Sequence, residues 1–158
     1  MTLEEISALP VRGLAAADCA LFLWARSPAL PEALEVIKAW GFAYKTVAFN
    51  WVKVDDSGKP RMGCGSYTRP STELCLLAIK GKMKVRDHGV HQTILAPRRE
   101  HSRKPVEQYG RIEKLFDAEP RLEMFARQRH VGWDPWGNET EKFEQTDLRC
   151  TVFDDMWI

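Results

Sequence analysis

Short uninterrupted apolar runs alternate along the chain with stretches in which apolar residues recur every three or four positions. Uninterrupted runs are typical of strands that are buried on both faces of a sheet. They predict strands at residues 19–24, 42–54, 73–79 and 93–96. The helical spacing predicts helices at residues 3–8, 27–41 and from Pro105 to Phe116. Strands that alternate with helices predict an α/β fold, with a largely parallel sheet covered by helices on both faces.

The ends of these helices carry recognisable capping residues. Thr2 and Glu5 have the capping-box spacing, in which each side chain accepts a hydrogen bond from the other's backbone N–H. Gly41 follows the second helix, where a residue with a left-handed backbone commonly ends the helical pattern. Pro105 suits the first turn of the third helix. The sequence therefore predicts where each helix begins or ends.

The stretch from Leu122 to Glu139 is the strongest candidate for a ligand site. Its first residues, Leu122 to Phe125, predict one more buried strand. Pro135 cannot donate a ladder hydrogen bond, and nearby glycines favour turns, so residues 127–139 are predicted to form a loop at the carboxyl end of that strand. Ligands bind at that end of the strands in open α/β sheets.

Length, charge and cysteine content narrow the class of protein. A chain of 158 residues fits one domain, and its formal net charge of +1 argues neither for nor against nucleic acid. No stretch is apolar enough to span a membrane, and the acidic start does not resemble a signal peptide. The cysteines include no Cys-x-x-Cys pair, which favours reduced thiols and a cytoplasmic location. They are Cys19, Cys64, Cys75 and Cys150.

A basic segment lies just before the third helix. Cations are disfavoured at the positive end of a helix dipole, so they suggest a compensating anion such as a ligand carboxylate or a phosphate. A solvated basic loop explains the same spacing equally well. The cations of this segment are Arg98, Arg99, Arg103 and Lys104, and the preceding segment adds Lys80, Lys82, Lys84 and Arg86 as a potential phosphate-contacting rim.

Several tryptophans lie where they could contact a ligand. Trp40 is on the apolar face of its helix, which predicts a core position. Trp24 and Trp51 end predicted strands, where stacking on a base and packing in the core are about equally expected. Asn138 could hydrogen-bond a ribose, and it is equally an ordinary turn residue. The long loop at residues 55–69 is rich in turn formers, and such loops are often functional.

Other chemistries are disfavoured. The four histidines lack the helical spacing of a metal site, and the sequence has no nucleophile elbow, phosphate loop or Gly-x-Gly-x-x-Gly turn. We therefore expect no metal site, and neither metal-dependent hydrolysis nor dinucleotide oxidoreduction. The histidines are His88, His91, His101 and His130.

These motifs, taken together, resemble a known family. The chain is similar to the MT-A seventy-kilodalton-subunit family of S-adenosylmethionine-dependent adenine-N6 methyltransferases, in its short phage and bacterial form. The resemblance runs from Leu3 to about Glu139 and implies a Rossmann-like α/β sheet. Its motifs are Leu21-Phe22-Leu23-Trp24, Trp40-Gly41-Phe42, Trp51-Val52-Lys53, Glu73-Leu74-Cys75, Ser102-Arg103-Lys104-Pro105 and Gly132-Trp133-Asp134-Pro135-Trp136-Gly137-Asn138-Glu139.

The resemblance implies roles for individual residues. Lys104 would contact the methionine carboxylate of S-adenosylmethionine, and Arg129 and His130 would lie near the methionine part. The ribose hydroxyls would be held by Arg127, Asn138 and Glu139. Trp24 and Trp51 would wall the cleft that admits the adenine. The loop at residues 55–69 and the basic residues would face nucleic acid; we assign Arg69, Arg98, Arg99 and Arg103 to this contact.

The family's catalytic motif, Asp-Pro-Pro-Trp, is expected upstream of the first helix, and the sequence does not contain it. Asp134-Pro135-Trp136 resembles that motif but falls in the ribose-binding segment. We therefore expect a methyltransferase domain at residues 1–140 that lacks its N-terminal catalytic strand, followed by a tail at residues 141–158. The alternative is a non-catalytic module that binds nucleic acid or supports an active partner, and the codons upstream of Met1 would distinguish the two. DNA is favoured over RNA as the partner, and a homo-oligomer or a partner subunit remains open.

Overall fold

The computed structural model describes residues 1–100 and 102–143. The chain divides into two compact units, Met1–Asp117 and Ala118–Ile158, and each is described by itself. Within the described residues, no helix has both the length and the apolar character needed to cross a membrane. The domain boundary expected after residue 140 stays a prediction.

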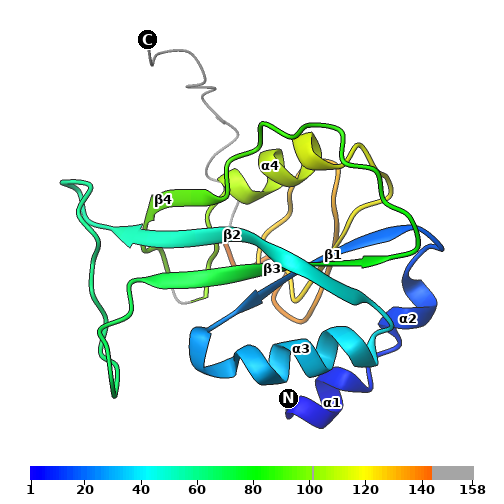
Figure 1. Ribbon diagram of the computed structural model, residues 1–158, viewed down its shortest axis with the longest axis horizontal. Coiled ribbons are helices and arrows are strands. Elements are labelled where there is room, and N and C mark those ends of the chain that lie inside the picture. The colour runs from blue at the N-terminus through cyan, green and yellow to red at the C-terminus, as the bar shows by residue number, and fades with distance from the viewer. Residues whose placement is uncertain (101, 144–158) are drawn as a thin grey trace. The chain divides into compact units, whose positions relative to one another are not determined.

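The helices of the first unit begin and end close to the predicted residues. Its helical elements are α1 (Leu3–Ser7), α2 (Val11–Leu14), the 3-10 helix η1 (Ser27–Ala29), α3 (Leu30–Ala39) and α4 (Glu107–Leu115) (Figure 1). The capping box is confirmed, because Glu5 N donates to Thr2 Oγ1 at 3.2 Å and Thr2 N donates to Glu5 Oε2 at 2.7 Å. Gly41 has a φ of +81°, as expected after a helix end. α4 begins at Glu107 rather than at Pro105.

The main sheet contains β1 (Cys19–Ala25), β2 (Ala43–Val54), β3 (Thr72–Lys80) and β4 (Thr93–Pro97), in the order β1-β3-β2-β4. The prediction of a largely parallel sheet is wrong. β3 lies antiparallel to both β1 and β2, and within the main sheet only β2 and β4 are parallel neighbours. The cause is the connection at residues 55–71, which contains no helix and so returns the chain directly beside β2. β1, α3 and β2 still form a crossover between strands of the same direction, with β3 inserted between them.

The centre of β3 is buried on both faces, as predicted. Successive strand residues point to opposite faces, and the four from Cys75 to Ala78 are all buried. Phe22 stacks on Phe49 with ring centroids 5.9 Å apart and meets Phe116 at 6.1 Å, so the end of α4 packs on that face. Trp40 is 2% exposed, which confirms its predicted place in the core.

The second unit corrects two predictions. Leu122–Met124 forms β5, but it has only three residues, Leu122 is exposed, and Phe125 leaves the strand with a φ of +60°. The predicted loop contains β6 (Asp134–Trp136), which pairs with β5 as a parallel two-stranded sheet separate from the main one. Both strands of such a pair are edge strands, a position that tolerates Pro135. The strand predicted at Leu122 is therefore confirmed, but its predicted burial is wrong, and the predicted loop is interrupted by β6.

Candidate functional site

The facing ends of β2 and β3 bring a lysine to a half-buried carboxylate. Trp51 is the cross-strand partner of Glu73, and Lys53 lies two residues further on the same face of β2. Lys53 Nζ donates to Glu73 Oε1 at 2.6 Å. The two side chains are 23% and 15% exposed, so this ion pair is better shielded from water than a surface pair.

A second lysine reaches the same carboxylate from the segment that precedes α4. Lys104 Nζ donates to Glu73 Oε2, so each carboxylate oxygen holds one lysine. Burial raises the pKa of Glu73, but the hydrogen bonds and charges of Lys104 and Lys53 lower it more, and the net pKa lies below its usual value. Glu73 is therefore ionised at neutral pH although most of its side chain is shielded from solvent.

Two tryptophans flank these charges. Trp24 and Trp51 meet edge to face, with centroids 6.4 Å apart and planes at 83°. Lys104 Nζ lies 5.5 Å from the Trp24 ring centroid and Lys53 Nζ lies 5.1 Å from that of Trp51, within the range of cation–π attraction. We call this set the Glu73 cluster; its members are Trp24, Trp51, Lys53, Glu73, Lys104 and Gln108.

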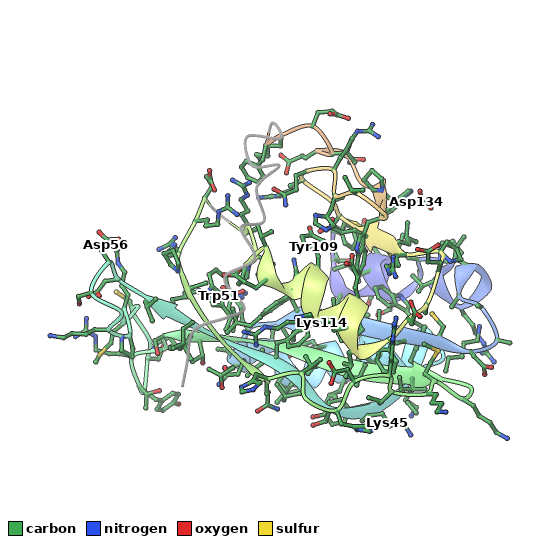
Figure 2. All side chains as sticks on the ribbon, turned by 90° about the horizontal axis from the view of Figure 1, so that it is seen from above. Lys45, Trp51, Asp56, Tyr109, Lys114 and Asp134 are labelled. Atoms are coloured by element: carbon green, nitrogen blue, oxygen red, sulfur yellow. The ribbon has the colours of Figure 1, made fainter. Side chains whose placement is uncertain are left out.

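Both indole N–H groups of the cluster have partners. Trp24 Nε1 donates to Oε1 of the buried Gln108 on α4, at 2.6 Å. Trp51 Nε1 donates to the carbonyl of Ala96 on β4, at 2.9 Å. Trp51 is 2% exposed whereas Trp24 is half-buried, so Trp51 is chiefly a packed wall and Trp24 offers more of its ring to a ligand. Figure 2 labels Trp51 among the side chains of the sheet.

The sequence alone assigns no role to three members of this cluster. Glu73 falls at the start of a predicted buried strand, and the pattern there does not show which group balances its charge. The useful signal is that a carboxylate beside a buried strand needs a cation, while the cations before α4 need an anion. Glu73 is such an anion for Lys104, supplied by the chain itself. Lys53 and Gln108 give no comparable signal.

The basic residues expected to face nucleic acid occupy varied positions. Arg69 and Arg98 are exposed, and Arg99 is half-buried. Arg103 Nη1 lies 3.2 Å from Glu100 Oε2. In the expected phosphate rim, Lys80 Nζ donates instead to the carbonyls of Arg12 and Ala15 at the end of α2, and Arg86 pairs with Asp117 at 2.6 Å.

The second unit brings together two of the residues assigned to the ribose. Arg127 Nη2 lies 3.0 Å from Glu139 Oε2, and Lys142 Nζ donates to Glu139 Oε1. Hydrogen bonding from Lys142 lowers the pKa of Glu139, and the charge of Arg127 adds to this effect. Arg129 pairs with Glu141 at 2.7 Å, Asn138 is exposed, and the carbonyl of His130 accepts from Trp133 N at 3.1 Å.

The turn before Asn138 depends on a glycine. Gly137 has a φ of +154°, and a Cβ there would lie 3.1 Å from the Cα of Phe125. Ala126 N donates to the carbonyl of Trp136 at 3.0 Å, and Phe125 meets Trp136 edge to face at 5.7 Å. These contacts fix where the chain leaves β6. Asn138 and Glu139 therefore follow a defined turn rather than a free loop.

The fold is a mixed α/β fold, with a charged and aromatic cluster where strands of its main sheet end. Comparison with known proteins defines it further. A family model described as MT-A70 matches residues 1–139, and the chain belongs to this family. The mixed sheet and its helices are consistent with a Rossmann-like methyltransferase segment of the family.

The chain is also similar to individual proteins. It is 38% identical over 141 residues to the Type II methyltransferase M.MunI of a Mycoplasma species. The aligned region covers 88% of this chain and 58% of that protein. It is 36% identical over 141 residues to the N(6)-adenosine-methyltransferase MT-A70-like protein of Arabidopsis thaliana, covering 86% and 20% of the two chains. The N(6)-adenosine-methyltransferase catalytic subunit METTL3 of Homo sapiens is 30% identical over 135 residues, covering 82% and 23%. The chain thus spans little more than half of the first relative and about a fifth of the others.

Proposed function

We propose that this chain is a segment of an S-adenosylmethionine-dependent methyltransferase that acts on the N6 amine of adenine in nucleic acid. The observation that carries the proposal is the pairing of Lys104 with Glu73 beside two tryptophans, in a chain of the MT-A70 family. The names of the relatives in Arabidopsis and Homo sapiens support the adenine N6 position.

The chemistry of the substrate explains why such a cluster is useful. The exocyclic amine of adenine is a poor nucleophile because its lone pair is delocalised into the ring. The base must leave its stack, be held between apolar walls, and be aligned with the activated methyl group. We propose that Trp24 and Trp51 provide such walls.

The donor set fits the proposed cofactor. S-adenosylmethionine supplies the activated methyl and carries a carboxylate at its amino-acid end. A lysine ammonium has three N–H donors, and Glu73 takes one of those of Lys104. We propose that Lys104 contacts the cofactor carboxylate while Glu73 holds its ammonium in place.

The second unit offers groups suited to a ribose. A diol donates two hydrogen bonds and accepts others, so an ionised carboxylate beside an amide and a guanidinium matches it chemically. We propose that Glu139, Asn138 and Arg127 bind the ribose hydroxyls, with Arg129 and His130 toward the methionine part. The ion pair of Arg127 with Glu139 supports this proposal because it orients both groups before a ligand binds.

The Asp-Pro-Pro-Trp motif does not occur in these 158 residues. Its carboxylate and the neighbouring backbone carbonyl would accept the hydrogen bonds of the adenine amine. We therefore propose that these 158 residues alone bind the cofactor weakly and transfer little or no methyl. The alternative is a non-catalytic module that binds nucleic acid or supports an active partner.

An assay of methyl transfer separates the two functions. The chain, and a version extended upstream to include any in-frame Asp-Pro-Pro-Trp, would be incubated with labelled S-adenosylmethionine and matched DNA and RNA oligonucleotides. We expect label at adenine N6 with the extended chain, on DNA more than on RNA, and little with the 158 residues. Absence of an upstream motif, with cofactor-independent nucleic-acid binding, would favour the non-catalytic module.

A further inference from the structure

Among the residues that the structure describes, Gln108 is the one buried residue whose side chain is neither apolar nor aromatic. It is 6% exposed and lies in the first turn of α4, which Figure 2 shows over one face of the main sheet. The other buried residues of this helix are Tyr109 and Ile112. An apolar side chain would occupy such a position without the cost of removing an amide from water. The amide of Gln108 therefore needs a specific partner.

Backbone hydrogen bonds hold Gln108 in a fixed place. Its N donates to the carbonyl of Pro105 at 3.3 Å, and Tyr109 N donates to the carbonyl of Val106 at 3.2 Å. Pro105 is fully buried and Tyr109 is 4% exposed, so both ends of this short stretch are anchored in the core. The first turn of α4 thus continues directly from the segment that carries Lys104, and Gln108 projects from a well-packed base.

The partner of this amide is the indole of Trp24 on β1. Trp24 Nε1 donates to Gln108 Oε1 at 2.6 Å, although the two residues are 84 positions apart in the sequence. An indole N–H can only donate, so the contact also fixes which end of the amide faces the ring. The ring has two other neighbours in the cluster: Trp51 meets it edge to face, and Lys104 Nζ lies 5.5 Å from its centroid. Gln108 is the neighbour that accepts the N–H.

This hydrogen bond selects one of two orientations of the Trp24 ring. The torsion between Cβ and the indole is broad and roughly two-fold, and a half-turn about it would carry the N–H to the opposite side, away from Gln108. A hydrogen bond of ordinary strength favours the bonded orientation by roughly fivefold. Because Trp24 is half-buried, the choice of orientation decides which part of its ring is open to a ligand.

We propose that Gln108 is a positioning residue, whose amide oxygen holds the Trp24 ring in the orientation that stacks on the target adenine. Stacking depends on overlap between ring faces, and a wall that can turn over binds a base less well. One short stretch of chain would then serve both ligands, with Lys104 contacting the cofactor and Gln108 acting on the adenine through Trp24. This inference rests on the proposed function, since it takes Trp24 as a wall of the adenine cleft.

Two-dimensional ¹H–¹⁵N NMR of the 158-residue chain tests the inference, with Trp24→Phe used to identify the indole signal of Trp24. The probe is 9-methyladenine, which has the base without ribose or phosphate, and it should shift this signal saturably in the wild type. Gln108→Leu should speed exchange of the Trp24 indole proton with water and weaken binding of 9-methyladenine by about threefold or more. Gln108→Met, which is unbranched and equally long, should repeat both effects. Gln108→Glu presents an acceptor oxygen in either protonation state and should stay within about twofold of the wild type.

Gln92→Leu is the matched control, because Gln92 bonds the carbonyl of Val47 outside the cluster, and it should change neither readout. Faster indole exchange with unchanged affinity for 9-methyladenine, in Gln108→Leu and Gln108→Met alike, would overturn the inference and leave Gln108 a purely structural role. An equal loss of affinity in Gln108→Glu would overturn it as well. A wild-type Trp24 signal that does not respond to 9-methyladenine would instead contradict the adenine cleft of the proposed function, and this inference with it.

Discussion

Lys104 and Glu73 are 31 residues apart in the sequence and form an ion pair at the end of the main sheet. The pair joins the segment before α4 to the first residues of β3, and Lys53 completes it from β2. One carboxylate thus links three parts of the chain. Both lysines of the Glu73 cluster depend on this carboxylate as their anion.

Replacing Glu73 with Gln should destabilise the first unit by about 1–3 kcal/mol, because two half-buried lysines lose their shared anion. Urea unfolding followed by tryptophan fluorescence measures this change. Glu100→Gln is the control, since Glu100 pairs with one arginine and is 55% exposed, so its loss should change the free energy of unfolding much less than the loss of Glu73 does. Equal effects of the two substitutions would show that the cluster contributes no special stability.

The free energy of unfolding should also depend on pH through the ionisation of Glu73. The pKa of Glu73 is lower in the folded protein than the ordinary value of 4.5. The stabilisation is therefore fully present above 4.5, and it is lost as the pH falls through the folded-state pKa. The difference in unfolding free energy between wild type and Glu73→Gln should shrink as the pH falls from 4.5 through the folded-state pKa. A difference that is constant over this range would contradict the pairing.

Gly137→Ala should destabilise the second unit by about 1–3 kcal/mol, because alanine rarely adopts a φ of +154° and its Cβ would crowd Phe125. Gly110→Ala in α4 should instead stabilise the protein. Nothing lies within 4 Å of the position that the alanine Cβ would take, and the higher helix propensity of alanine should contribute up to about 1 kcal/mol. Hydrogen exchange resolved by peptide would locate each effect. Faster exchange throughout the first unit in Gly137→Ala would refute a local role for this turn.

The cysteines should differ in reactivity toward a thiol reagent in a Cys150→Ser background. Cys64 is exposed in the connection between β2 and β3, whereas Cys75 is fully buried in β3. Burial raises the pKa of Cys75, and the charge of Lys104 offsets this only in part. We expect rapid modification of Cys64 and none of Cys75 until the protein unfolds, as mass spectrometry would show. Early labelling of Cys75 would mean that the centre of β3 is open.

Local patterns predict the elements of this fold better than their pairing. The capping box at Thr2, the strand beginning at Cys19 and the turn at Gly41 depend on neighbouring residues, and all three are confirmed. The direction of β3 depends on its connection to β2, and an apolar run has the same appearance in either direction. The pairing of β5 with β6 escapes prediction because each strand is only three residues long.

For the candidate site, too, the sequence predicts some features and the fold alone shows others. The family resemblance brings Arg127 and Glu139 together by role, and the structure places them 3.0 Å apart. The link from Lys104 to Glu73 joins segments that are distant in sequence, so no local spacing reveals it. The sequence shows that Glu73 and Lys104 each need a counter-ion, and only the fold shows that they are each other's counter-ion.

Calorimetric titration of the chain with S-adenosylmethionine tests the proposed cofactor site most directly. The double variant Lys104→Ala with Asn138→Ala should bind at least tenfold more weakly than the wild type, because it removes one hydrogen bond to the carboxylate and one to the ribose. Lys53→Ala is the matched control: it removes the other lysine of Glu73 without a proposed cofactor contact, so its affinity should stay close to that of the wild type. Unchanged affinity in the double variant, while the protein remains folded, would contradict the placement of the cofactor.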